Sequence, residues 1–205
     1  MSSVERLVIA TANRHKVHEI RSILESLGGE TAHIALAGLG DYPGVVMPVE
    51  DGDSFLANAR IKACSVSCQT GEVCLADDSG LVVDGLGGEP GIHSARFLGE
   101  DATDSQRNQA ILAMLAQRPE APRTARFVCA AVIAFPDGQV LEVQETCEGQ
   151  IARTPSGDGG FGYDPIFYFP EFACTLAEVP SDRKNQVSHR GKAMRGIIRK
   201  LRELL

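Results

Sequence analysis

The sequence predicts an α/β fold in which helices flank a mixed β-sheet, and three observations support this class. Short apolar runs typical of buried strands alternate with segments whose apolar residues recur at helical spacing. One pair of runs flanks Pro136-Asp137-Gly138, a strong hairpin signal that adds antiparallel pairing. The chain has 205 residues, of which 43% are apolar and 23% charged, so it suits a single domain over 1–205 with a mainly aliphatic core.

The first part of the chain predicts two strands and two helices. The expected elements are a buried strand over 4–10, a helix that ends at Gly28-Gly29, a short strand near 31–37 and a helix over 54–68 that Asp53 or Ser54 caps. Val17, Ile20, Ile23, Leu24 and Leu27 give the first helix its apolar stripe. A loop rich in Pro and Gly separates the second strand from the second helix.

The rest of the chain predicts a further helix, the hairpin and a final helix. The expected elements are strand pieces at 73–76 and 81–84 on either side of Asp77-Asp78-Ser79-Gly80, a Gly-rich loop over 85–100, a helix at about 104–117, strands at 125–135 and 139–147, and a last amphipathic helix that carries Met194, Ile197, Ile198, Leu201 and Leu205. The order of the strands in the sheet does not follow from the sequence.

Composition narrows the range of partners and compartments. The net charge of −7 repels nucleic acid and anionic lipid, and the basic residues of 188–205 are explained by a solvated helix face, so neither partner is expected. The apolar run at 127–135 is too short to cross a bilayer, and 1–13 lacks the apolar core of a signal peptide. The six cysteines contain no CxxC pair, which favours reduced thiols, a cytoplasmic location and no zinc site.

Polar residues that could bind a phosphate chain follow the first predicted strand. The segment Thr11-Ala12-Asn13-Arg14-His15-Lys16 opens a helix, whose free N–H groups attract anions, and Lys16 adds a point charge. It lacks the pattern of a P-loop. The alternative interpretation is that Asn13 only caps the helix, and the segment alone does not decide between the two.

Two acidic segments could hold a cation. Glu50-Asp51-Gly52-Asp53 precedes a helix on which Asn58 and Lys62, four residues apart, share a face. Asp77 and Asp78 lie between apolar strand pieces, where two unpaired carboxylates are costly to bury, so a metal or another cation is expected beside them. Oxygen ligands favour Mg²⁺ or Mn²⁺. The alternatives are a charged first helical turn and a simple turn of an Asx type.

Two later segments could bind a planar ring. Gly159-Gly160-Phe161-Gly162-Tyr163-Asp164-Pro165 offers a stacking face and an acceptor, and Lys184 with Ser188-His189-Arg190 offers donors. Each could also be a tight loop or a capped helix with surface charge. Taken together, the segments describe a polyanion, a hard cation and a ring with polar edges, which a nucleoside triphosphate with Mg²⁺ would satisfy.

The ordered set of motifs resembles a known enzyme family from about residue 6 to the C-terminus. Thr11-Ala12-Asn13 with Lys16 and Glu19, SFLANARIKA, LADDSGLVVDGLGGEPGIHSARF, GGFGYDPIF and SHRGKAM stand in the order and spacing of the non-standard purine nucleoside triphosphate pyrophosphatases, the inosine/xanthosine triphosphate pyrophosphatase family. The resemblance implies hydrolysis of ITP, dITP and XTP to the monophosphate and pyrophosphate, which removes deaminated purines from the nucleotide pool. It also implies an elongated mixed sheet with two lobes around a central substrate cleft, and a homodimer.

The resemblance further assigns roles to individual residues. It implies that Asp78 accepts a proton and that Glu50 and Asp78 hold Mg²⁺, with Mn²⁺ as a substitute. The implied substrate contacts are Thr11, Ala12, Asn13, Arg14, His15, Lys16, Lys62, Ser79, Phe161, Gly162, Tyr163, Asp164, Lys184, His189 and Arg190. Donors such as His189 or Arg190 would meet the C6 oxygen of inosine or xanthine, whereas adenine presents a donor there and would be rejected.

Two other classes of protein share parts of this pattern. A nucleotide-binding sensor would use the same phosphate and base contacts but would not need Glu50 and Asp78 to converge on a metal. A Maf-like pyrophosphatase would share the Mg²⁺ chemistry and prefer modified pyrimidine triphosphates. A panel of nucleotide substrates separates the three classes.

Overall fold

The computed structural model describes residues 4–30 and 33–205, and its strands form one sheet. Within those residues the sheet has seven strands in the order β2-β1-β3-β4-β5-β6-β7. The strands are β1 (Arg6–Ile9), β2 (Ala35–Gly38), β3 (Val73–Val83), β4 (Thr124–Ala134), β5 (Val140–Ile151), β6 (Phe167–Phe169) and β7 (Cys174–Thr175). The helices are α1 (Arg14–Ser26), α2 (Phe55–Thr70), α3 (Asp104–Ala116), α4 (Ser181–Val187) and α5 (His189–Leu204).

The sheet is mixed, as the sequence predicts. β1 pairs in parallel with both β2 and β3, whereas β5 pairs antiparallel with β6 and β6 with β7. The predicted hairpin closes where Phe135 N–H donates to the carbonyl of Gln139 over 2.9 Å. The predicted α/β class with flanking helices is therefore confirmed.

The chain divides into two compact units with separate cores. The first unit comprises the residues up to Asp78 together with Cys129–Glu145 and Arg190–Leu205, and the second comprises Ser79–Val128 and Thr146–His189. The long strands β3, β4 and β5 supply residues to both units. Two units agree with the two lobes that the family resemblance implies.

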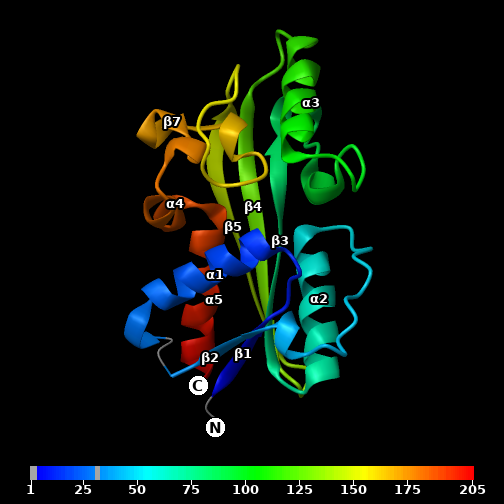
Figure 1. Cartoon of the computed structure of the whole chain (residues 1–205), viewed down its shortest axis with the longest axis vertical. Coiled ribbons are helices and arrows are strands. Elements are labelled where there is room, and N and C mark those ends of the chain that lie inside the picture. Colours follow the sequence, from blue (N-terminus) through cyan, green and yellow to red (C-terminus); the bar gives the residue numbers. More distant parts are fainter. Residues whose placement is uncertain (1–3, 31–32) are drawn as a thin grey trace. The chain divides into compact units, whose positions relative to one another are not determined.

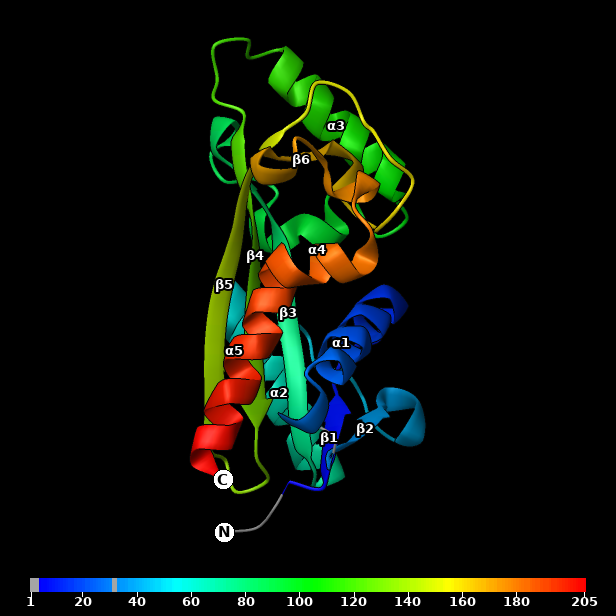
Figure 2. The same ribbon diagram turned by 90° about the vertical axis from the view of Figure 1, so that its left-hand side faces the viewer.

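In the first unit, helices cover both faces of the sheet. Leu7 and Ile9 of β1 pack in one core with α1 and α5, whereas Val8 between them is fully buried on the opposite face. Figures 1 and 2 show α2 on the side of the sheet opposite to α1 and α5. Because both faces of these strands are covered, both sets of alternating side chains are apolar, as is typical of parallel strands.

In the second unit, aromatic and aliphatic side chains fill the core. The rings of Phe127 and Phe167 lie 4.5 Å apart at their centroids, and Ile111 and Leu115 of α3 pack into the same cluster. The apolar stripe of α3 therefore faces this core as its spacing predicts.

Several predicted boundaries are wrong. The expected break between strand pieces at Asp77–Gly80 is the middle of the continuous strand β3, because the acids have cations beside them and need no loop. The expected loop over 85–100 contains two 3₁₀ helices, Asp84–Leu86 and Gly91–Arg96. β2 begins later than expected, and Thr31 and Ala32 of that prediction lie outside the described residues. The sequence does not predict β6, β7 or α4, because these elements are short and lack a periodic pattern.

Across residues 4–30 and 33–205, none of the helices combines the length and the apolar character that crossing a bilayer requires.

Candidate active site

Asp77 and Asp78 lie next to each other on β3 and face opposite sides of the sheet. Side chains alternate along a strand, so Asp77 points toward the helices α1 and α5 and Asp78 points toward α2. Both are buried. β1 pairs with the first part of β3, and Ala10 N–H donates to the carbonyl of Leu75 over 2.8 Å, so the segment after β1 leaves the sheet beside the two acids. Ligands of α/β proteins bind at this carboxyl end of parallel strands.

The side chain of Asp77 is fully buried between two cations. Its Oδ2 lies 3.0 Å from Lys16 Nζ and 3.3 Å from Arg190 Nη2. Arg190, itself buried, forms a second ion pair with Glu19 of α1. Burial alone would raise the pKa of Asp77, but Lys16 and Arg190 outweigh it and hold that pKa far below its usual range. Asp77 is therefore the acid of β3 that is harder to protonate.

Asp78 belongs to a different set of contacts on the α2 side of β3. Its Oδ1 lies 3.3 Å from Lys62 Nζ, and its Oδ2 accepts a hydrogen bond of 3.2 Å from Asn58 Nδ2. Lys62 Nζ also lies 2.8 Å from Glu50 Oε2, so one ammonium bridges two carboxylates. Burial raises the pKa of Asp78 although Lys62 and Lys16 oppose it. Asp78 is thus the acid of β3 that is more easily protonated.

The start of α2 explains how these groups come together. Ser54 caps the helix, since its hydroxyl accepts from the N–H of Ala57 over 3.2 Å. Asn58 and Lys62 follow one turn apart on the buried face of the helix, as their spacing predicts. Asn58 Oδ1 accepts a hydrogen bond of 2.9 Å from the N–H of Gly52. The one amide therefore connects the segment that carries Glu50 to the carboxylate of Asp78.

The donor set around Lys62 fits a hard divalent cation. Glu50 and Asp78 offer carboxylate oxygens on either side of a position that already holds a positive group. No cluster of three or more Asp, Glu, His or Cys able to hold a metal is found in the described part of the chain. Mg²⁺ is commonly bound by one or two carboxylates together with substrate phosphates, so two carboxylates suffice.

The segment after β1 is organised around Asn13. Its Oδ1 accepts from the N–H groups of His15 and Lys16 over 3.0 and 3.1 Å, so Asn13 is the N-cap of α1. Thr11 Oγ1 accepts in turn from Asn13 N–H. Of the six predicted contacts here, Ala12, Asn13, Arg14 and His15 are exposed, and Lys16 turns inward to Asp77. The capping interpretation is therefore observed.

In the second unit, Phe161, Asp164 and Lys184 form a compact group. Asp164 Oδ2 accepts from Phe161 N–H over 2.9 Å and lies 2.6 Å from Lys184 Nζ, which stands 5.2 Å from the centre of the Phe161 ring. Asp164 and Lys184 are buried. A side chain at Gly160 would place Cβ 2.1 Å from Asp164 Oδ2, so only glycine fits there.

Two other predicted contacts of the second unit, Tyr163 and His189, are buried. Tyr163 is buried and its hydroxyl donates to the carbonyl of Ser94 over 2.8 Å, while burial raises the pKa of that hydroxyl. His189 stacks on Phe127 with 4.7 Å between ring centres. Ser79 is half-buried on β3. Tyr163 and His189 therefore have packing roles that the sequence alone did not show.

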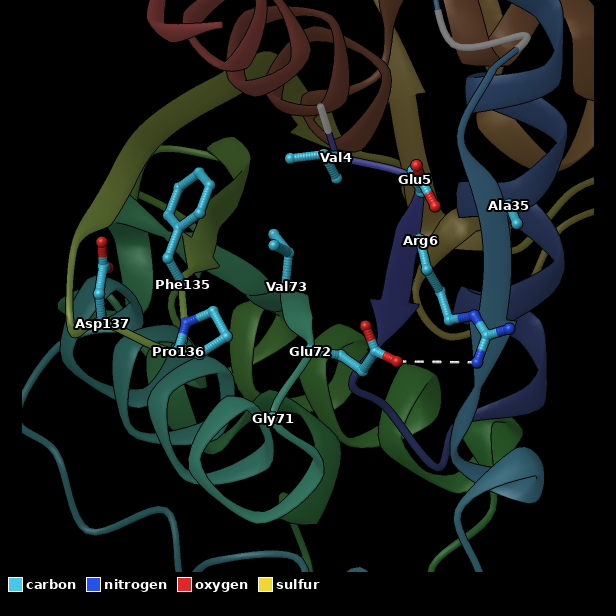
Figure 3. Close-up of a pocket in the computed structure, with 10 residues that line it drawn as sticks. All are labelled: Val4, Glu5, Arg6, Ala35, Gly71, Glu72, Val73, Phe135, Pro136 and Asp137. Atoms are coloured by element: carbon cyan, nitrogen blue, oxygen red, sulfur yellow. Dashed lines mark ion pairs between the residues drawn. The ribbon is translucent and has the colours of Figure 1, made fainter. Parts of the chain in front are cut away.

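A separate cavity lies at the opposite ends of the parallel strands of the first unit (Figure 3). Its volume is about 750 Å³, and its lining includes Glu5 and Arg6 at the start of β1 and Glu72 just before β3. Arg6 and Glu72 form an ion pair of 3.7 Å across it. None of the predicted site residues lines this cavity, so its size does not mark it as the active site.

Comparison with known proteins identifies the family. The family model described as Ham1 family matches residues 7–200. The chain belongs to the Ham1 family. The dITP/XTP pyrophosphatase of Desulforamulus reducens is 45% identical over 199 residues, which cover 97% of this chain and 96% of that protein. The dITP/XTP pyrophosphatase of Geobacillus kaustophilus is 44% identical over 191 residues, covering 93% and 91%.

A solved structure supports the same assignment. The HAM1 protein from Coxiella burnetii is 37% identical and superposes with a TM-score of 0.86, covering 97% of this chain and 98% of that one. This Ham1 chain therefore shares its fold with a solved member over nearly its full length. Sequence reasoning missed two polar residues of α3, Asp104 and Asn108, which contact the loop at Gly162. The signal for Asn108 is an amide placed three and seven residues before Ile111 and Leu115, the buried apolar side chains of the same helix face.

Proposed function

We propose that this Ham1 chain is a dITP/XTP pyrophosphatase, which hydrolyses dITP, XTP and ITP to the nucleoside monophosphate and pyrophosphate. The full-length similarity to dITP/XTP pyrophosphatases of two organisms supports this activity. The observation that carries the proposal is the pair of carboxylates, Glu50 and Asp78, on either side of one cationic position.

The proposal includes a divalent metal, Mg²⁺ or Mn²⁺, held by Glu50 and Asp78. When bound, the metal neutralises phosphate charge that would otherwise repel an attacking water. The first unit has an excess of negative charge in which a cation would be stabilised. Its carboxylates Glu19, Glu50, Asp77 and Asp78 face the three cations Lys16, Lys62 and Arg190.

Asp78 is proposed to accept the proton of the attacking water. The water adds to the α-phosphorus, the bond from that phosphorus to the bridging oxygen of the β-phosphate breaks, and pyrophosphate leaves with the electron pair. The proton moves to a carboxylate oxygen of Asp78, whose pKa is raised by burial and thus nearer to the working pH than that of an ordinary aspartate. Lys16 and Lys62 would neutralise charge on the phosphate tail.

The residues of the second unit are proposed to bind the base. Phe161 would stack on the purine ring, and Lys184 and Asp164 supply a donor and an acceptor. The C6 oxygen of inosine or xanthine needs a donor, which Lys184 provides, whereas the C6 amino group of adenine would face that donor without pairing. Arg190, expected from the sequence to serve the base, is engaged by Asp77 and Glu19 in the first unit.

The test is pyrophosphate release from ITP, XTP, dITP, GTP, ATP and dUTP, with Mg²⁺ and with EDTA. Fast cleavage of the first three that EDTA abolishes, with the monophosphate as co-product, is the expected result. Release of orthophosphate or a preference for dUTP would refute the assigned reaction or substrate class, and absence of products would indicate a nucleotide sensor. The homodimer and the cytoplasmic location remain predictions, and light scattering on the purified chain tests the first.

A further inference from the structure

Two side chains of α3 bind the two peptide groups that flank the Cα of Gly162. Asp104 Oδ2 accepts a hydrogen bond of 2.7 Å from Gly162 N–H, and Asn108 Nδ2 donates one of 3.0 Å to Gly162 carbonyl oxygen. The two residues are four apart, so they share one face of the helix. We refer to Asp104 and Asn108 as the Gly162 clamp.

We propose that the Gly162 clamp is a positioning and specificity device, which sets where the ring of Phe161 and the carboxylate of Asp164 meet the substrate base. This inference rests on the proposed function, since it assigns the base to the same group of residues. Gly162 lies between the two residues in sequence and adopts a φ of +63°. Asp164 N–H donates to the carbonyl of Phe161 over 3.3 Å and closes a turn around Gly162, and the contacts from α3 attach this turn to the helix.

The structure of the loop explains how the clamp would act on both residues. Phe161 N–H donates to Asp164 Oδ2, and the same oxygen binds Lys184. These bonds join Phe161, Asp164 and Lys184 into one group, but they leave the direction of the group to the backbone at Gly162. Because a single hydrogen bond is modest in free energy, one bond to each of the two peptide groups beside Gly162 fixes the loop better than either bond alone.

The clamp itself is anchored in α3. Asp104 Oδ1 lies 3.5 Å from Arg107 Nη1, and Arg107 also donates to the carbonyls of Phe97 and Gly99 over 2.9 and 3.0 Å. Thr103 caps the helix just before Asp104. Asp104 is thus held from one side by Arg107 and keeps its other oxygen for Gly162.

In the part of the chain that the structure describes, Asn108 buries a polar atom without a hydrogen bond, which is unfavourable for stability. It is 4% exposed, and no described residue donates a hydrogen bond to its Oδ1. A leucine of similar size would fill the same space without a buried, unsatisfied acceptor, so the amide serves its one bond, the donation to Gly162.

The experiment compares Asn108→Ala with Gln109→Ala, an exposed amide one residue along the same helix, and Asp104→Ala with Asp104→Asn, which keeps an acceptor. Steady-state kinetics with ITP and ATP are expected to show a KM for ITP about 3- to 10-fold higher in both clamp variants and a lower ratio of ITP to ATP kcat/KM. kcat for ITP should change by less than about twofold, because Asp78 is untouched. Gln109→Ala should behave as wild type and Asp104→Asn should recover most of the effect.

A second measurement separates the clamp from the proposed function. Amide hydrogen exchange of Gly162, followed by NMR on the same proteins, should accelerate at least about tenfold in Asp104→Ala and remain slow in Asp104→Asn. KM values and ITP-to-ATP ratios in both clamp variants equal to those of Gln109→Ala would overturn the proposal, as would unchanged exchange in Asp104→Ala. If wild type cleaves neither ITP nor XTP, the proposed function fails, whereas the exchange data still decide whether the clamp exists. Asp104 is half exposed, so its variants should fold even if Asn108→Ala does not.

Discussion

The two units position their polar groups in different ways. In the first unit, ion pairs do this: Lys16, Lys62 and Arg190 position the buried carboxylates of β3 and α1. In the second, the buried ion pair between Asp164 and Lys184 is placed by a hydrogen bond from the backbone of a glycine loop. The difference would suit the proposed roles, because phosphates and a metal are recognised by charge, whereas a base is recognised by the shape and edge of a flat ring.

The largest expected effect is on the free energy of unfolding when Arg190, the cation shared by Asp77 and Glu19, is removed. Arg190→Met leaves two buried carboxylates without it and should lower the free energy of unfolding by about 3–5 kcal/mol. Urea unfolding measures this value, with Arg199→Met on the exposed face of the same helix as control. A loss no larger than that of the control would show that charge pairing does not organise the first unit.

Replacing Asp78, the proposed proton acceptor, should lower turnover without unfolding the protein. Asp78→Asn keeps the shape of the side chain and should lower kcat for ITP by at least about 10²-fold while the protein remains folded. The matched control is Asp51→Asn, an exposed acid one residue after Glu50, which should retain wild-type turnover. Near-normal turnover by folded Asp78→Asn would remove Asp78 from this role.

Acid should weaken the first unit through Asp77. The pKa of this carboxyl is lower in the folded chain than its ordinary value of 3.8, so its stabilising contribution is complete above that pH and declines as the pH falls further. The pKa of Asp78 is raised in the folded chain, so protonation of Asp78 stabilises the fold as the pH falls. We expect the free energy of unfolding of wild type to drop between pH 5 and about pH 3 more than that of Asp77→Asn. Equal drops would assign the acid sensitivity to other groups.

The smallest effect is expected at the surface of the second unit. Asp84 accepts a hydrogen bond of 2.5 Å from Thr124 and one of 3.0 Å from Arg126, and these contacts lower its pKa. Its side chain is more than a third exposed, so solvent screens the pair and Asp84→Asn should cost at most about 1 kcal/mol in urea unfolding. A cost close to that of Arg190→Met would contradict the view that burial makes the charges of the first unit decisive.

Much of the fold follows from local patterns. The apolar spacing of α1, α3 and α5, the Ser54 cap of α2 and the Pro-Asp-Gly hairpin are each encoded within a few residues, and all five elements are confirmed. The spacing of Asn58 and Lys62 also predicts their common face. Strand order does not follow in this way, because neighbours such as β3 and β4 are separated in sequence by α3.

Tertiary structure alone decided what the charged residues do. The sequence presents Asp77 and Asp78 as a pair between two strand pieces that share one cation. The continuous strand sends them to opposite faces, where Asp77 meets Arg190 from α5 and Asp78 meets Lys62 from α2. Likewise, Asn108 has no visible partner in sequence, since Gly162 is 54 residues away. Local patterns follow from interactions between neighbouring residues. A buried charge or amide takes its role from the partner that satisfies it, and only the folded chain brings that partner into reach.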